Sequence, residues 1–283
     1  MVVTLRFIVG RAGTGKTHMC LTEIGERAKR DNGTNLIYLV PEQATFQTER
    51  AILQGHPAGG IMNIQVLSFQ RLAWRVLQET GGGLYPPLNE LGKVLILRRL
   101  VEIHKEKFKV FGRVIERPGF LENLVKGISE FKLYAVSPQL LETCLLHEEI
   151  NRHPSLPDKL ADLTLIYQEF EAYIKNQYLD TDDYLNLLVN NIHRASFLHN
   201  AEVWVDGFHG FTPQEYHVLK ELLLKCAKIT VTVCLAEEHT RRFLPETHTF
   251  YPPWETYQRL RQLASEANCP LEKDVVLDFS GEH

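Results

Sequence analysis

Short apolar segments alternate with segments of helical periodicity in the first and last parts of the chain. The first, LRFIVG (5–10), ends in glycine and precedes a glycine-rich loop. Strands that alternate with helices through short loops are typical of a parallel sheet covered by helices on both faces. The pattern therefore predicts an α/β domain, with strands at 5–10, 35–40, 64–69, 203–208, 228–235 and 275–279 and helices at 17–30, 43–54, 71–79, 212–226 and 254–267.

The pattern changes after the glycine- and proline-rich segment GGGLYPPLN (81–89), which predicts a break. From there to about residue 195 we expect helices only, and in one of them seven apolar side chains share a stripe that predicts a core-facing surface. The predicted α/β domain thus occupies 1–88 and 196–283 and is interrupted by an all-helical insertion at 89–195. The expected helices are 91–106, 119–133, 138–147, 158–174 and 183–193, and the stripe is Leu160, Leu163, Ile166, Tyr167, Phe170, Tyr173 and Ile174.

Composition places few further limits on the chain. Its 283 residues are 44% hydrophobic and 23% charged, which is ordinary for a soluble globular protein. No apolar run approaches the ~20 residues that span a bilayer, and the start has no basic segment of the kind that opens a signal peptide, so we expect a cytoplasmic protein without a membrane partner. The five cysteines never form a CxxC pair, which argues against a zinc site or a disulfide framework.

Charge is distributed unevenly along the sequence. Residues 1–135 contain 19 Lys and Arg against 12 Asp and Glu, whereas residues 136–283 contain 12 against 23, which together give the net charge of −4. The basic half is compatible with a nucleic-acid-binding face, and equally with ordinary solvated charge.

The loop GRAGTGKT fits the phosphate-binding pattern G-x-x-x-x-G-K-[ST] between a predicted strand and a predicted helix. Glycines allow backbone N–H groups to surround phosphate oxygens, and the positive end of the helix adds to the attraction. The lysine reaches the β- and γ-phosphates, and the threonine hydroxyl holds Mg²⁺. The predicted nucleotide-binding residues are Gly10, Arg11, Ala12, Gly13, Thr14, Gly15, Lys16 and Thr17.

A second element of this chemistry is VWVDGF, an apolar strand that ends in Asp206. A carboxylate at the carboxyl end of a strand reaches a magnesium ion beside Thr17, so we expect Thr17 and Asp206 to be the metal ligands. Hydrolysis also needs a group that positions water in line with the γ-phosphate. Gly207, the next residue, has no such group, which leaves His209 as a weaker candidate. Glu215 is explained by a capping box with Thr212.

Three functions remain open on these residues alone. One is a nucleotide-binding module that hydrolyses poorly, and the second is a DNA-dependent ATPase motor that uses His209. The third is a small-molecule kinase, for which Arg241 and Arg242 are the one hint of a mobile lid.

Four segments occur in the order typical of superfamily 1 helicases: the loop at 10–17, LVPEQATFQTER (39–50), LSFQRLAWRV (67–76) and VDGFHGF (205–211). Together with TFYPPWETYQRL (249–260), they make the whole chain resemble the AddB family, the B subunit of the bacterial AddAB helicase–nuclease. The resemblance implies a RecA-like P-loop domain with a helical insertion like the helicase 1B subdomain.

The resemblance also implies a context for the chain. It implies that this chain is the N-terminal part of a longer subunit, which pairs with an AddA-type motor and acts on double- and single-stranded DNA in recombinational repair. In that complex AddB helps to recognise the Chi sequence. ATP and Mg²⁺ are the implied cofactors of this part. An iron–sulfur cluster and the nuclease residues are expected beyond residue 283.

This sequence differs at particular positions from the sequence of an active helicase of this kind. Gly207 replaces the catalytic glutamate and Gln70 replaces a histidine, and the few residues before the first strand leave no room for the motif that reads adenine. Loops after the second and third strands face DNA in such helicases, where polar groups bind phosphates and aromatic rings stack on bases. The resemblance therefore implies DNA contacts at Gln43, Thr45, Phe46, Ser68, Gln70 and Arg71.

Overall fold

The computed structural model describes residues 3–30, 33–55, 63–81 and 85–278. The chain divides into two compact units, one formed by Met1–Gly82 with Leu185–His283 and the other by Gly83–Tyr184. We call them the α/β unit and the helical unit. Within the described residues, no helix combines the length and hydropathy needed to cross a bilayer.

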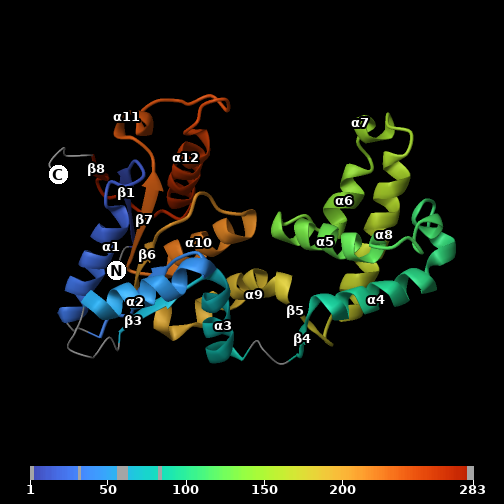
Figure 1. Ribbon diagram of the computed structural model, residues 1–283, viewed down its shortest axis with the longest axis horizontal. Helices are drawn as coiled ribbons and strands as arrows, with labels where there is room; N and C mark the ends of the chain where they lie inside the picture. The colour runs from blue at the N-terminus through green and yellow to red at the C-terminus, as the bar shows by residue number, and fades with distance from the viewer. Residues whose placement is uncertain (1–2, 31–32, 56–62, 82–84, 279–283) are drawn as a thin grey trace. The chain divides into compact units, whose positions relative to one another are not determined.

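The α/β unit is built on a six-stranded sheet in the order β3-β2-β6-β7-β1-β8, in which every pairing is parallel (Figure 1). This confirms the predicted α/β class and its parallel sheet. The predicted strand 64–69 ends early because Ser68 already caps the following helix, accepting a 3.2 Å hydrogen bond from the Arg71 backbone N–H. The strands are β1 Thr4–Gly10, β2 Leu36–Leu39, β3 Ile64–Leu67, β6 Glu202–Val205, β7 Lys228–Cys234 and β8 Val275–Leu277.

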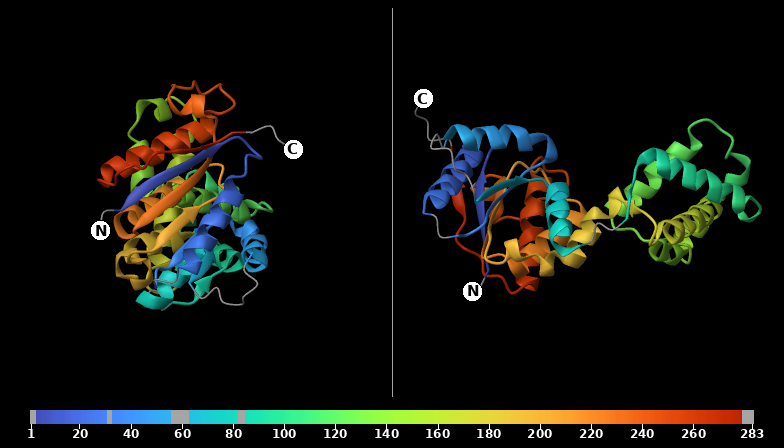
Figure 2. Two further views of the ribbon diagram at one scale, coloured as in Figure 1. Left: turned by 90° about the vertical axis from the view of Figure 1, so that its left-hand side faces the viewer. Right: turned by 90° about the horizontal axis from the view of Figure 1, so that it is seen from below.

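Helices cover both faces of this sheet. Adjacent residues of β1 point to opposite faces: Ile8 lies in a cluster with Ile24 of α1, whereas the Phe7 ring lies 4.6 Å from that of Tyr257 in α12. Figure 2 shows α1 in blue and α12 in red on opposite sides of the strands. Burial on both sides explains why these strands are mostly apolar. The helices are α1 Lys16–Lys29, α2 Thr45–Gly55, α3 Phe69–Thr80, α9 Tyr184–Asn191, α10 Pro213–Lys225, α11 Glu237–Thr240 and α12 Tyr251–Glu266, with short 3₁₀ turns at Glu42–Ala44, Ile192–Arg194 and Ser196–Leu198.

The predicted capping box at the start of α10 is present. The Thr212 hydroxyl accepts a hydrogen bond from the Glu215 N–H at 3.3 Å, and the Glu215 carboxylate accepts one from the Thr212 N–H at 2.8 Å. The two residues thus satisfy two otherwise unpaired backbone donors.

The helical unit packs its helices around one apolar core, and the predicted stripe lies in it, with Ile166, Tyr167, Phe170 and Ile174 buried. The expectation of helices only was wrong at one place. β4 Pro87–Leu88 pairs in parallel with β5 Leu179–Asp180, and two residues are too few to show a periodicity. The helices are α4 Glu90–Ile103, α5 Phe120–Leu133, α6 Pro138–Cys144, α7 Glu148–Asn151 and α8 Leu156–Ile174, with 3₁₀ turns at Lys105–Lys107, Phe111–Arg113 and Thr181–Asp183.

Candidate nucleotide-binding site

The loop after β1 has a backbone that requires glycine. Gly13 and Gly15 have φ angles of 83° and 87°, in the left-handed region that side chains disfavour. Gly10 is required for a different reason, since a Cβ there would lie 2.6 Å from the carbonyl oxygen of Leu277 in β8 and would also meet the Thr14 hydroxyl. The loop is therefore held closely between the sheet and the start of α1.

Positive charge gathers at this loop. The Lys16 ammonium donates to the carbonyl oxygens of Gly10 at 2.8 Å and Arg11 at 2.7 Å. The first turn of α1 carries no acidic residue of its own, and the positive end of the helix dipole lies at the loop. The exposed Arg11 guanidinium lies 3.8 Å from the Glu238 carboxylate of α11. Cationic groups and a helix N-terminus make this loop suited to an anion.

Asp206 follows directly after β6 and is 5% exposed. Its carboxylate accepts three hydrogen bonds, from the hydroxyls of Thr17 at 2.7 Å, Tyr38 at 2.8 Å and Thr232 at 2.6 Å. The three donors come from α1, β2 and β7, and all three are neutral. A carboxylate beside a threonine hydroxyl is the kind of oxygen donor set that Mg²⁺ prefers, so Thr17 and Asp206 fit that ion.

Burial and the neighbouring Asp206 charge both raise the pKa of Tyr38 far above its ordinary value. The phenol therefore stays protonated and serves as a donor. Burial likewise raises the pKa of the Cys20 thiol, which leaves this cysteine unreactive.

Gly207 takes a backbone conformation that a glutamate would not readily adopt. Its φ angle is 80°, and a Cβ there would lie 3.4 Å from the Pro41 side chain. Phe208 packs its ring 5.4 Å from Phe69 and 5.1 Å from Phe211. His209 is exposed and lies at a cavity of about 300 Å³. Position 207 therefore has neither a carboxylate nor a backbone conformation that favours one.

The six residues expected to contact DNA lie in two different environments. Gln43, Phe46 and Gln70 are exposed, Phe46 to 72%. Two are buried and bonded locally: the Thr45 hydroxyl donates to the Glu42 carbonyl at 2.9 Å, and the Ser68 hydroxyl donates to the Glu42 carboxylate as well as capping α3. Arg71 forms ion pairs with Glu42 at 3.2 Å and Glu49 at 3.0 Å.

Two residues at the site were not anticipated from the sequence, Tyr38 and Thr232. Each is a hydroxyl-bearing residue within an apolar strand, LIYL and KITVTVC. A hydroxyl in a strand buried on both faces needs a hydrogen-bond partner, and this signal could have identified them.

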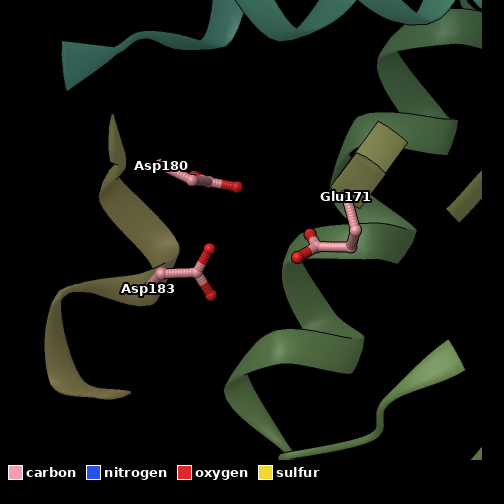
Figure 3. Close-up of side chains that lie close together, drawn as sticks. All are labelled: Glu171, Asp180 and Asp183. Atoms are coloured by element: carbon pink, nitrogen blue, oxygen red, sulfur yellow. The ribbon is translucent and has the colours of Figure 1, made fainter. Parts of the chain in front are cut away.

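A separate acidic cluster lies in the helical unit, where Glu171, Asp180 and Asp183 bring carboxylate oxygens within 4.8 Å of one another (Figure 3). The Lys132 ammonium occupies the space between them, at 2.7, 2.7 and 2.6 Å respectively. Lys93 binds Asp180 from another side at 2.6 Å. Lys132 thus contacts all three carboxylates that a metal would need, and Lys93 contacts one of them.

Comparison with known proteins places the chain in a family. The family profile described as "ADDB, N-terminal" matches residues 7–282. The chain is 46% identical over 278 residues to a Moorella thermoacetica protein named as the B subunit of an ATP-dependent helicase/deoxyribonuclease, covering 97% of the chain and 24% of that protein. Proteins of the same name from Geobacillus kaustophilus and Heliobacterium modesticaldum are 40% and 44% identical, and the match covers 24% and 23% of their lengths. The chain thus spans about a quarter of these relatives, and it belongs to the AddB N-terminal family.

Proposed function

We propose that the α/β unit is a RecA-like domain that binds ATP and Mg²⁺ at residues 10–17 and Asp206 and hydrolyses ATP poorly. The observation that carries the proposal is the 2.7 Å hydrogen bond from the Thr17 hydroxyl to Asp206. It joins residues 189 positions apart in the sequence at the carboxyl edge of the sheet, where parallel α/β proteins bind their ligands.

The proposed roles follow from the chemistry of the side chains. The Lys16 ammonium and the backbone N–H groups of the loop would bind phosphate oxygens. The Thr17 hydroxyl and the Asp206 carboxylate would hold Mg²⁺, which when bound neutralises phosphate charge. The proposal of poor hydrolysis rests on Gly207, which has neither a carboxylate to orient water nor a backbone suited to one.

For the whole protein, we propose the B subunit of a helicase–nuclease that acts with an AddA-type subunit on double- and single-stranded DNA in cytoplasmic recombinational repair. The names of the relatives support this proposal, as does the family match, and both speak against the small-molecule kinase. An iron–sulfur cluster and the nuclease site would then belong to the part of the protein beyond residue 283.

We also propose a DNA-facing surface at the loops after β2 and β3. Gln43, Phe46, Gln70 and Arg71 would supply the contacts, since their side chains are exposed in whole or in part. Phe46 offers a stacking surface for a base. Thr45 and Ser68 would instead shape the loops, because their hydroxyls are engaged by Glu42.

Binding of a fluorescent ATP analogue, measured with and without Mg²⁺, tests the nucleotide proposal. Lys16→Ala is expected to weaken binding by about 10- to 100-fold, the effect of losing hydrogen bonds to charged groups. Asp206→Asn is expected to remove the gain that Mg²⁺ provides. Lys29→Ala, an exposed lysine at the other end of α1, is the matched control and should bind normally. Absence of binding by the unaltered chain at millimolar nucleotide would refute the proposal.

A further inference from the structure

The hydrogen bonds around Asp206 are distributed unequally between its two carboxylate oxygens. Oδ2 accepts from Thr17 and Tyr38, whereas Oδ1 accepts from Thr232. A carboxylate has about four acceptor positions. The three hydroxyls therefore account for three of these positions, two on Oδ2 and one on Oδ1.

Two of the three donors are fixed to the sheet. Tyr38 is fully buried on β2 in a cluster with Cys20, Ile24 and Trp204. β2 pairs with β6, and the Asp206 N–H continues the ladder by donating to the Leu39 carbonyl at 3.0 Å. The Tyr38 ring and the Asp206 backbone are thus held in one register by the same two strands.

Thr17 differs from these anchors because it is exposed, at the second residue of α1. Its hydroxyl is the donor that would face a bound ion. A carboxylate that accepted from Thr17 alone could rotate about its Cβ–Cγ bond. The buried hydroxyls of Tyr38 on Oδ2 and Thr232 on Oδ1 restrict that rotation and fix the orientation of the carboxylate.

We propose that Tyr38 is a positioning residue that orients the Asp206 carboxylate for Mg²⁺. The Mg²⁺ dependence of nucleotide affinity then relies on a hydroxyl that contacts neither the ion nor the nucleotide. Thr232 acts in the same way from β7. This inference rests on the proposed nucleotide function and assigns part of it to two buried strand residues.

The test is Tyr38→Phe, which removes one oxygen atom and keeps the buried ring. Affinity for a fluorescent ATP analogue is measured in this chain with Mg²⁺ and with chelator. The readout is the ratio of the dissociation constant with chelator to the dissociation constant with Mg²⁺. We expect the ratio to fall by about fivefold, the usual effect of one lost hydrogen bond. Thr232→Val should lower it by a similar factor.

Tyr257→Phe is the matched control. Its hydroxyl donates to Asp274 at 2.6 Å and accepts from Arg261 at 2.8 Å, so this change also removes a buried tyrosine's bond to an aspartate. We expect it to leave the ratio unchanged. A general loss of folding would weaken binding equally with and without Mg²⁺ and so would not change the ratio.

The outcomes separate this inference from the function on which it rests. If the unaltered chain binds nucleotide in a Mg²⁺-dependent manner and Tyr38→Phe keeps the same ratio, the positioning role is wrong and the proposed function stands. If the unaltered chain binds no nucleotide, both are wrong. A ratio lowered in Tyr38→Phe and preserved in Tyr257→Phe supports the inference.

Discussion

Two buried aspartates, one in each unit, are satisfied in opposite ways. Asp206 in the α/β unit accepts hydrogen bonds from three neutral hydroxyls. Asp180 in the helical unit is bound by the ammonium groups of Lys132 at 2.7 Å and Lys93 at 2.6 Å. Neutral donors orient a carboxylate without cancelling its charge, whereas ammonium groups cancel it. The comparison teaches that an acidic residue suits a cation only where the protein has not already supplied one.

Removing the buried cation from the helical unit should have the largest effect. Lys132→Met leaves Asp180, whose side chain is 0% exposed, with one fewer countercharge. We expect a loss of about 3–5 kcal/mol in the free energy of unfolding, the usual result of breaking a buried ion pair. Chemical denaturation followed by circular dichroism measures it. Asp180→Asn in the same variant should recover part of the loss, and an unchanged stability would contradict the structural role of Lys132.

Acid should weaken the helical unit through the same aspartate. Burial alone would raise the pKa of Asp180, but Lys132 and Lys93 lower it below its ordinary value. The stability that the Asp180 carboxylate contributes is therefore fully present above the unfolded pKa of about 3.9 and is lost as pH falls further. We expect the difference in unfolding free energy between the natural protein and Asp180→Asn to shrink below about pH 4.

Referring the pH dependence to Asp180→Asn reduces the influence of the neighbouring Glu171. Burial raises the pKa of Glu171, so the contribution of that carboxyl has the opposite sign and is present in both proteins. A difference that stays constant from pH 7 to pH 3 would contradict the lowered pKa of Asp180.

A glutamate introduced at position 207 tests whether the site lacks only the catalytic carboxylate. Gly207→Glu should lose about 1–2 kcal/mol of stability, because a left-handed backbone is unfavourable for residues with a Cβ. We expect no gain in phosphate release from Mg²⁺–ATP. Gly207→Ala should lose a similar amount, since the cost comes from the backbone. Efficient hydrolysis by the glutamate variant would show that the turn itself is competent.

The smallest effect on stability is expected at Asp206. Asp206→Asn should change the free energy of unfolding by less than about 1 kcal/mol, because its neutral hydroxyl partners can reorient toward an amide. Denaturation of this variant beside Asp180→Asn compares the two sites directly. If Asp206→Asn is the more damaging change, the distinction between a positioned and a neutralised carboxylate is wrong.

Much of the fold could be predicted because its signals are local. Continuous apolar segments identified the strands of a sheet that helices cover on both sides, and the stripe through Ile166 and Phe170 identified a core-facing helix. Errors came where a signal was too short or was shared by two elements. β4 and β5 have two residues each, and Ser68 was assigned to a strand although it caps α3.

The site shows the same division. The sequence by itself determined the loop GRAGTGKT and its glycines, the aspartate at the end of an apolar strand and the missing glutamate, because each depends on residue types at fixed spacing. Only the tertiary structure decided what surrounds Asp206 and the acidic cluster. Tyr38 and Thr232 reach Asp206 from neighbouring strands, and Lys132 reaches Asp180 from a helix 48 residues earlier in the chain. Such contacts depend on strand order and helix packing, which bring together side chains that no spacing along the sequence relates.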